Sequence, residues 1–158
     1  MNVQGKNIII TGGSLGIGKE TARTLVQKGA NVLITGRSEN RLIEAKHYTG
    51  ANIIEFDISD HENISENAVK CIDVLNGRVD VLINNAGIGV RKSIDELKIE
   101  DFLKVFNVNV FGLALFTKEI VPHMIKESYG TIINIGSTAS LKGYKNGSIY
   151  SSSKFAVR

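Results

Sequence analysis

The chain of 158 residues is 42% hydrophobic and 22% charged, and its formal net charge is +3. The composition is that of an ordinary globular protein, and the length suits a single domain. Lysine and arginine are scattered rather than clustered with aromatic residues, which argues against a nucleic-acid partner, and no apolar run approaches the ~20 residues of a membrane span.

The only cysteine, Cys71, excludes a disulfide within the chain and fits a reducing compartment. It falls on a helical stripe with Ile64, Ala68 and Leu75, so we interpret it as a core residue. The N-terminus lacks the charged and apolar regions of a signal peptide. We therefore expect a soluble, cytoplasmic protein with no membrane partner.

Short β-rich runs alternate with longer helical patterns along the chain. Because the strands are apolar throughout, this alternation favours an α/β fold with a doubly wound parallel sheet, covered on both faces. Strands are predicted at residues 6–11, 31–36, 51–56, 79–84 and 130–137. Helices are predicted from the glycine loop to Gly29, at about 39–48, 61–76 and 99–125, and from about 148.

The first strand is followed by a glycine loop, TGGSLGIG, at residues 11–18. Residues without a Cβ permit a tight strand-to-helix turn and let the backbone approach a pyrophosphate at a helix N-terminus. Its position between the first strand and a helix favours phosphate binding over a bare connecting turn. The residues that we expect at this part of the site are Gly12, Ser14, Leu15, Gly16, Ile17 and Gly18.

The next two strands end in residues that suggest which nucleotide binds. Arg37 follows the second strand at the place where an acidic residue would bind an adenosine ribose hydroxyl and an arginine would instead bind a 2′-phosphate. We therefore expect NADP(H) in preference to NAD(H). Asp57 and Ile58 follow the third strand and join this predicted site. Asp57 has two open roles, as an acceptor for the adenine amino group or as a cap for the next helix.

Tyr150 and Lys154 are four residues apart on the last predicted helix, which places them on one face. Tyrosine is ordinarily a poor base at neutral pH, and a neighbouring ammonium stabilises the phenolate. Such a tyrosine can exchange a proton with a carbonyl or an alcohol oxygen. Ser137, at the end of the fifth strand, can hydrogen-bond the same oxygen. Any Tyr-x3-Lys pair alone is more often a surface pair, but here it accompanies a nucleotide loop.

Taken together, these motifs resemble those of the short-chain dehydrogenase/reductase family. The matching segments are TGGSLGIG at 11–18, NNAG at 84–87, NVNVFG at 107–112, Ser137 in INIGS, and YSSSK at 150–154. They occur in the order of the family and at closely similar separations. The resemblance implies a single NAD(P)-binding Rossmann domain over residues 1–158.

The resemblance also implies a role for each matching residue. Tyr150 is then the general acid/base, and Lys154 activates it and binds the nicotinamide ribose. Ser137 orients the substrate carbonyl, and Asn109 holds the bend of the long helix and a water of the proton relay. Residues 84–87, with Asn84, Ala86 and Gly87 among them, border the cofactor, as do Tyr150 and Lys154 themselves.

Members of the family continue well past the Tyr-x3-Lys pair, with two further strands, a substrate-covering segment and surfaces that pair subunits. We therefore expect the domain to be incomplete at its C-terminus, either as part of a longer, homo-oligomeric reductase or as a truncated gene product. The function implied is NADP(H)-dependent hydride transfer between a small-molecule carbonyl and a secondary alcohol, without a metal. The alternatives are a nucleotide-binding fragment without catalysis and a remnant without function.

Overall fold

A computed structural model describes residues 2–158, and within them five parallel strands form one sheet in the order β3-β2-β1-β4-β5. Each strand lies inside the range predicted for it, so the predicted α/β class and the parallel sheet are confirmed. The strands are β1 (Asn7–Ile10), β2 (Asn31–Gly36), β3 (Asn52–Glu55), β4 (Val81–Asn84) and β5 (Thr131–Asn134).

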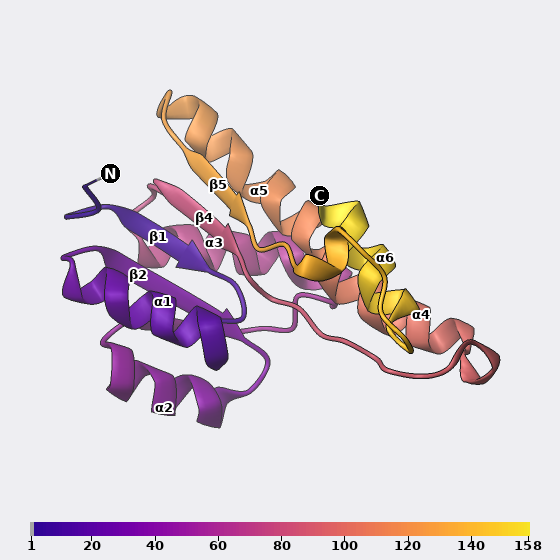
Figure 1. Cartoon of the computed structure of the whole chain (residues 1–158). Coiled ribbons are helices and arrows are strands. Elements are labelled where there is room, and N and C mark those ends of the chain that lie inside the picture. The colour runs from indigo at the N-terminus through magenta and orange to yellow at the C-terminus, as the bar shows by residue number, and fades with distance from the viewer. Residues whose placement is uncertain (1) are drawn as a thin grey trace.

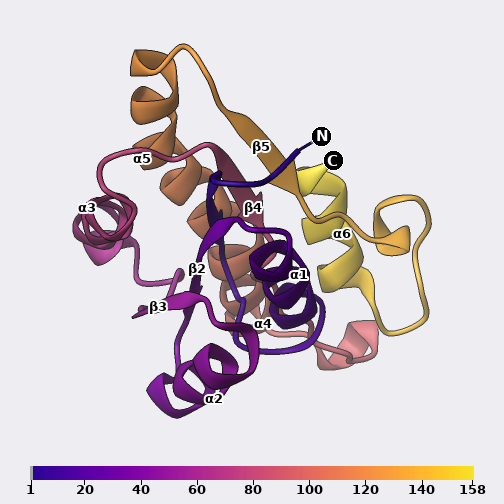
Figure 2. The same ribbon diagram turned by 90° about the vertical axis from the view of Figure 1, so that its left-hand side faces the viewer.

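Helices cover both faces of this sheet (Figures 1 and 2). The α-helices are α1 (Gly16–Gln27), α2 (Glu39–Thr49), α3 (Ile64–Val74), α4 (Ile99–Phe106), α5 (Leu113–Lys126) and α6 (Ser148–Val157). Short 3-10 turns lie at η1 (His61–Asn63), η2 (Ile94–Glu96) and η4 (Thr138–Ser140). No helix within residues 2–158 is both long enough and apolar enough to cross a membrane.

The in-register pairing of the strands explains why each reads as a continuous apolar run. Ile9 pairs with Leu33 on one side and with Leu82 on the other, and this row packs against α3 and α5. The alternate positions of the same strands pack against α1 and α2. Because both faces of the central strands are buried, apolar residues fill most of their positions, and the buried polar residues Thr35 and Asn84 lie near the carboxyl ends of β2 and β4. Cys71 is fully buried in the first of these layers, as predicted.

The long helix predicted at about 99–125 is present but is not a uniform α-helix. Six residues between α4 and α5, Asn107–Gly112, form a π-helical segment, η3. Segments of this kind are rare and occur frequently at functional sites. Helix α6 packs against α4, η3 and η4, so the end of the chain lies beside this segment.

The strand order places a topological switch point between β1 and β4. The chain winds outward from β1 through β2 to β3, and α3 then returns it to the other side of β1. Loops that leave neighbouring strands diverge at such a point and open a crevice at the carboxyl ends of the strands, where ligands bind in folds of this kind.

Candidate functional site

A cleft of about 380 Å³ opens at the carboxyl ends of the first four strands. It contains the ends of strands that lie far apart in the sequence, because the parallel sheet brings all their carboxyl ends to one edge. The lining residues are Gly12, Ser14, Leu15, Gly16, Ile17, Thr35, Gly36, Arg37, Ser38, Arg41, Phe56, Asp57, Ile58, Asn85, Ala86, Gly87, Ile88 and Val108.

The glycine loop contributes the N-terminus of α1 to this cleft. The helix begins at Gly16, and its N-cap residue Leu15 makes no side-chain cap, so the first-turn N–H groups are available to a ligand. Gly12 has φ +65°, and a Cβ there would lie 2.8 Å from the Cα of Ala86. A Cβ at Gly18 would lie 2.5 Å from Nδ2 of Asn85. These glycines therefore allow the loop to pack directly on the end of β4, and the uncapped helix end suits a pyrophosphate.

Asn85, one of the residues 84–87 expected to border the cofactor, lines the cleft and also joins the glycine loop to the loop after β4. Its amide donates to the carbonyl oxygens of Thr11 and Gly12 at 3.0 Å each. In return, the backbone N–H groups of Asn85 and Ala86 both donate to Oγ1 of Thr11 at 3.1 Å. This network fastens the glycine loop to the loop after β4 beside the cleft.

Two arginines line the cleft beside the end of β2. Arg37 was predicted there. Arg41 lies in the first turn of α2 and was not predicted, although its spacing of four residues from Arg37 could have indicated it. Both side chains are exposed, and among residues 2–158 no carboxylate lies within ion-pair distance of either. This end of the cleft therefore carries two positive charges without a counter-ion from the described chain.

Asp57 lines the cleft and also shapes the turn that follows β3. One carboxylate oxygen accepts hydrogen bonds from the N–H of Ser59 at 2.9 Å and from its hydroxyl at 2.7 Å. The carboxylate therefore holds the loop before η1 and makes no cap on α3, whose N-cap residue is Asn63. A contact between Asp57 and an adenine stays a prediction.

A second, wider pocket of about 1020 Å³ adjoins the cleft and shares Gly87 and Ile88 with it. It brings together Ser137, which follows β5, and Tyr150 of α6, two residues of the predicted catalytic group. A Cβ on Gly89 would lie 3.4 Å from the Tyr150 ring, so the loop after β4 passes directly beside the tyrosine. Ser137 Oγ accepts a hydrogen bond from the N–H of Ala139 at 3.1 Å, which leaves its own proton free to be donated.

Lys154 lies one turn after Tyr150 on α6 and is almost completely buried. Its ammonium donates to the carbonyl oxygen of Ile135 at 2.7 Å, and burial lowers the pKa of this lysine. A Cβ on Gly87 would lie 3.7 Å from the Lys154 Nζ. The lysine is therefore anchored at the end of β5, and its ammonium lies close to the loop at which the cleft and the pocket meet.

Asn109 supports the same loop from the π-helical segment. Its amide oxygen accepts from the N–H of Ile88 at 2.8 Å, and its Nδ2 donates to the carbonyl oxygen of Ile88 at 2.9 Å. The Nδ2 also donates to Oγ of Ser153 at 2.9 Å. Asn109 thereby connects η3, the loop after β4 and α6, while its side chain stays 1% exposed.

Asn84 and Gly18, both predicted cofactor-binding residues, do not line the cleft. The amide of Asn84 points to its neighbours in the fold and donates to Thr117 and to Asn134 at 2.9 Å each. Its amide oxygen is buried without a hydrogen-bond partner within the described chain. Tyr150 borders the second pocket rather than the cleft, and Lys154 lines neither.

A parallel sheet with a glycine loop at its switch point defines the Rossmann-like class of nucleotide-binding α/β domains. Within this class the chain belongs to the short chain dehydrogenase family, which matches residues 6–158. The family resemblance inferred from the motifs is thereby confirmed.

Two curated relatives and one solved structure illustrate the similarity. A 2-dehydro-3-deoxy-L-rhamnonate dehydrogenase (NAD(+)) of Sphingomonas sp. is 34% identical over 97% of this chain and 62% of its own. An NADP-dependent 3-hydroxy acid dehydrogenase of Escherichia coli is 33% identical over 96% of this chain and 62% of its own. The structure of an NAD+-bound xylitol dehydrogenase is 28% identical, with a TM-score of 0.90 over 99% of this chain and 62% of that one. The chain thus spans less than two thirds of the length of each.

Proposed function

We propose that the chain binds NADP(H) and supports hydride transfer between this cofactor and a carbonyl or secondary alcohol. The observation that carries the proposal is the junction at Gly87 and Ile88, where the nucleotide cleft meets the pocket of Ser137 and Tyr150. A dinucleotide laid along the cleft would end at this junction, beside the two hydroxyl groups. The related proteins are named dehydrogenases, which supports the same reaction class.

The bound cofactor supplies the hydride, and the chain supplies position and a proton. In the direction of reduction, the Ser137 hydroxyl donates a hydrogen bond to the substrate carbonyl oxygen and polarises it. The Tyr150 hydroxyl donates its proton to that oxygen as the hydride reaches the carbon. Lys154 is held beside Gly87 by its hydrogen bond to Ile135, and Asn109 fixes the Ile88 backbone, so both residues act by positioning.

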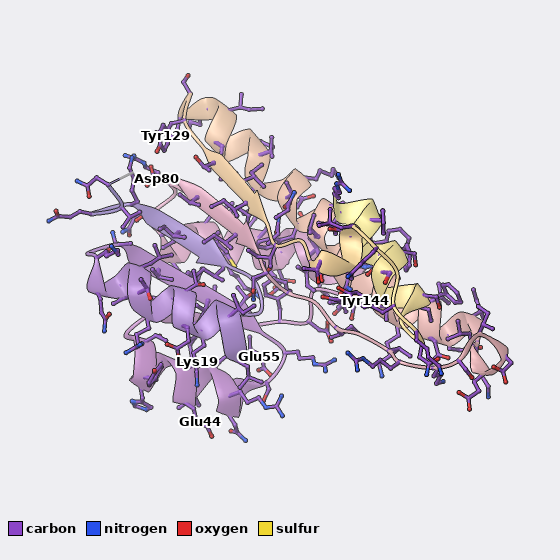
Figure 3. The ribbon with its side chains drawn as sticks, viewed as in Figure 1. Lys19, Glu44, Glu55, Asp80, Tyr129 and Tyr144 are labelled. Carbon is purple, nitrogen blue, oxygen red and sulfur yellow. The ribbon has the colours of Figure 1, made fainter. Side chains whose placement is uncertain are left out.

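Replacement of Tyr150 tests the reaction. We expect Tyr150→Phe to lower NADPH-dependent reduction of a panel of small ketones by about 10²-fold or more, because the proton donor is lost. NADPH affinity, measured by cofactor fluorescence, should change little. The matched control is Tyr129→Phe, because Tyr129 lies just before β5, at the amino ends of the strands and far along the sheet from the pocket (Figure 3). Full turnover in Tyr150→Phe would refute the role of this tyrosine.

Saturable NADPH binding without turnover in the unaltered chain would favour a nucleotide-binding protein without catalysis.

The preference for NADP(H) rests on Arg37 and Arg41. Because arginine binds phosphate through charged hydrogen bonds of about 1.5–3 kcal/mol each, we expect the double change to glutamine to weaken NADPH binding at least about tenfold. NADH binding should stay unchanged, because NADH has no 2′-phosphate. Arg23→Gln is the control, since Arg23 lies on α1 and pairs with Glu20 instead. Equal affinity of the unaltered chain for NADH and NADPH would overturn the preference.

A further inference from the structure

The pocket that holds Ser137 and Tyr150 is lined by positive charges and by no negative ones. Arg91 and Lys145 are the charged side chains among its described lining residues, and neither aspartate nor glutamate is present. The remaining residues that line it are Gly87, Ile88, Gly89, Val90, Thr138, Tyr144 and Gly147. The proposed hydride transfer gives roles to Ser137, Tyr150 and Lys154, and it gives none to Arg91 or Lys145.

The two cations come from different loops that the fold fastens together. Arg91 lies in the loop after β4, and Lys145 lies between η4 and α6. Their chain neighbours meet, because the N–H of Lys92 donates to the carbonyl oxygen of Asn146 at 3.2 Å. Asn146 adopts a left-handed conformation with φ 59°, which turns the second loop at this contact. The two backbone segments that carry Arg91 and Lys145 are therefore fastened to each other where both residues line the pocket.

The ion pairs of this region leave the two cations without a counter-ion. The ammonium of Lys92 is bound by both carboxylate oxygens of Asp101 at 2.9 and 2.8 Å, which anchors the first loop to α4. Arg91 and Lys145 have no carboxylate within ion-pair distance anywhere in residues 2–158. Charges of one sign that line a concave surface raise the local concentration of ligands of the opposite sign.

The loop that carries Lys145 is also fixed to the catalytic end of the pocket. Tyr144 is hydrogen-bonded through its hydroxyl to Oγ1 of Thr138, the residue after Ser137. Figure 3 shows Tyr144 on the side of the molecule to which the carboxyl ends of the strands point. A ligand that contacts Ser137 and Tyr150 therefore occupies the same pocket that Arg91 and Lys145 line.

We propose that Arg91 and Lys145 bind an acidic group of the substrate, so that the substrate is a carbonyl or hydroxy compound that carries a carboxylate or a phosphate. This inference deepens the proposed function and rests on it. The planar guanidinium of Arg91 suits both oxyanions through paired hydrogen bonds, and the ammonium of Lys145 adds a second charge. The two cations select the substrate, whereas Ser137 and Tyr150 act on its carbonyl.

Binding in the presence of NADP+ tests the inference without turnover, because a ketone cannot be reduced by the oxidised cofactor. The probes are acetoacetate with its methyl ester and dihydroxyacetone phosphate with dihydroxyacetone, each followed by ligand-observed NMR. We expect at least one acidic probe to bind about tenfold more tightly than its neutral counterpart. The pair that shows this preference identifies a carboxylate or a phosphate as the group bound.

Variants then locate the site of the preference. We expect Arg91→Gln and Lys145→Gln each to weaken binding of the preferred acidic probe about three- to tenfold and to leave its neutral counterpart unchanged. Lys142→Gln is the matched control, because Lys142 lies three residues before Lys145 and outside the pocket lining. It should leave both affinities unchanged.

The inference and the proposed function fail in different ways. Equal or absent binding of the acidic and neutral probes, or a preference that survives the double variant of Arg91 and Lys145, overturns the inference. NADPH-dependent reduction of neutral ketones alongside such a result would leave the proposed function intact. A preference for the acidic probe that requires both cations, but with no reduction of any ketone by NADPH, would retain the anion site and refute the proposed function.

Discussion

At the scale of single residues, Asn109 is a buried residue of the candidate site whose side chain makes several hydrogen bonds. It satisfies both backbone groups of Ile88 and reaches Ser153 while almost completely buried. We expect Asn109→Ala to lower the free energy of unfolding by about 2–4 kcal/mol, because two buried backbone groups lose their partners. Urea denaturation followed by circular dichroism measures this difference.

Asn107 provides the matched control two residues earlier in the same π-helical segment. Its described hydrogen bond outside the helix is made by its backbone, through the carbonyl oxygen that meets His61. We expect Asn107→Ala to change the free energy of unfolding by less than about 1 kcal/mol. Equal destabilisation by the two variants would show that the effect belongs to the helix and not to the amide of Asn109.

Lys154 makes the stability of the chain depend on pH in a definite direction. Burial lowers its pKa in the folded chain below the ordinary value of 10.5. The unfolded chain therefore binds more protons at this site between the two pKa values, and stability rises with pH over that interval. Lys154→Met removes the titrating group. We expect the stability of the unaltered chain relative to this variant to increase between about pH 7 and about pH 10.

Urea unfolding of both proteins at the two pH values gives the necessary comparison. The hydrogen bond from Lys154 to Ile135 affects the difference at each pH, but the change with pH reports the ionisation. A stability difference that stays constant or shrinks as the pH rises would contradict the buried, depressed-pKa state of Lys154.

At the scale of elements, the π-helical segment packs closely against the loop after β3. A Cβ on Gly112 would lie 2.3 Å from the carbonyl oxygen of Ile58 and 2.9 Å from that of Asn107. Both neighbours are backbone atoms, which cannot move aside as a flexible side chain would. We expect Gly112→Ala to lower the free energy of unfolding by at least about 2 kcal/mol, as measured by chemical denaturation. Gly143, with open space around it, is the control, and Gly143→Ala should fall within about 0.5 kcal/mol.

The pattern of the sequence predicts the elements well because each strand and helix buries a periodic apolar surface. The pattern over residues 99–125 also predicts a helix, but it does not distinguish an α-helix from one with a π-helical segment. That segment packs through Gly112 against Ile58, a residue of the loop after β3 that lies far away in the sequence. Contacts of this kind have no periodic signature in the sequence.

In the candidate site too, the sequence predicts residues whose place follows from a neighbouring strand, but not residues whose orientation depends on the folded structure. Arg37 was found because its place follows directly from the end of β2. Arg41 lines the cleft only because α2 begins at Glu39 and turns that residue toward it. Asn84 and Asn85 are adjacent in NNAG, yet the former points to Thr117 and the latter into the loop network of the cleft. The sequence alone did not separate these two orientations.

At the scale of the whole molecule, the two edges of the sheet differ in kind. The order of the strands cannot be read from an apolar pattern, and only the structure shows that β3 and β5 are the edges. Strand β3 presents polar residues at its ends, Asn52 and Glu55, both exposed. Strand β5 instead exposes two isoleucines, Ile132 and Ile133, at 40% and 42%. An apolar edge with unpaired backbone groups favours pairing with other chains.

The chain of 158 residues should therefore self-associate through β5 in a concentration-dependent way. We expect Ile133→Lys to reduce light scattering at raised protein concentration, because a charge on an edge strand opposes the approach of a second strand. Ile125→Lys is the matched control, since Ile125 is 70% exposed and belongs to helix α5 rather than to the edge strand. It adds the same charge and should leave the scattering near that of the unaltered chain. If both variants reduce scattering equally, net charge rather than the edge of β5 governs the association.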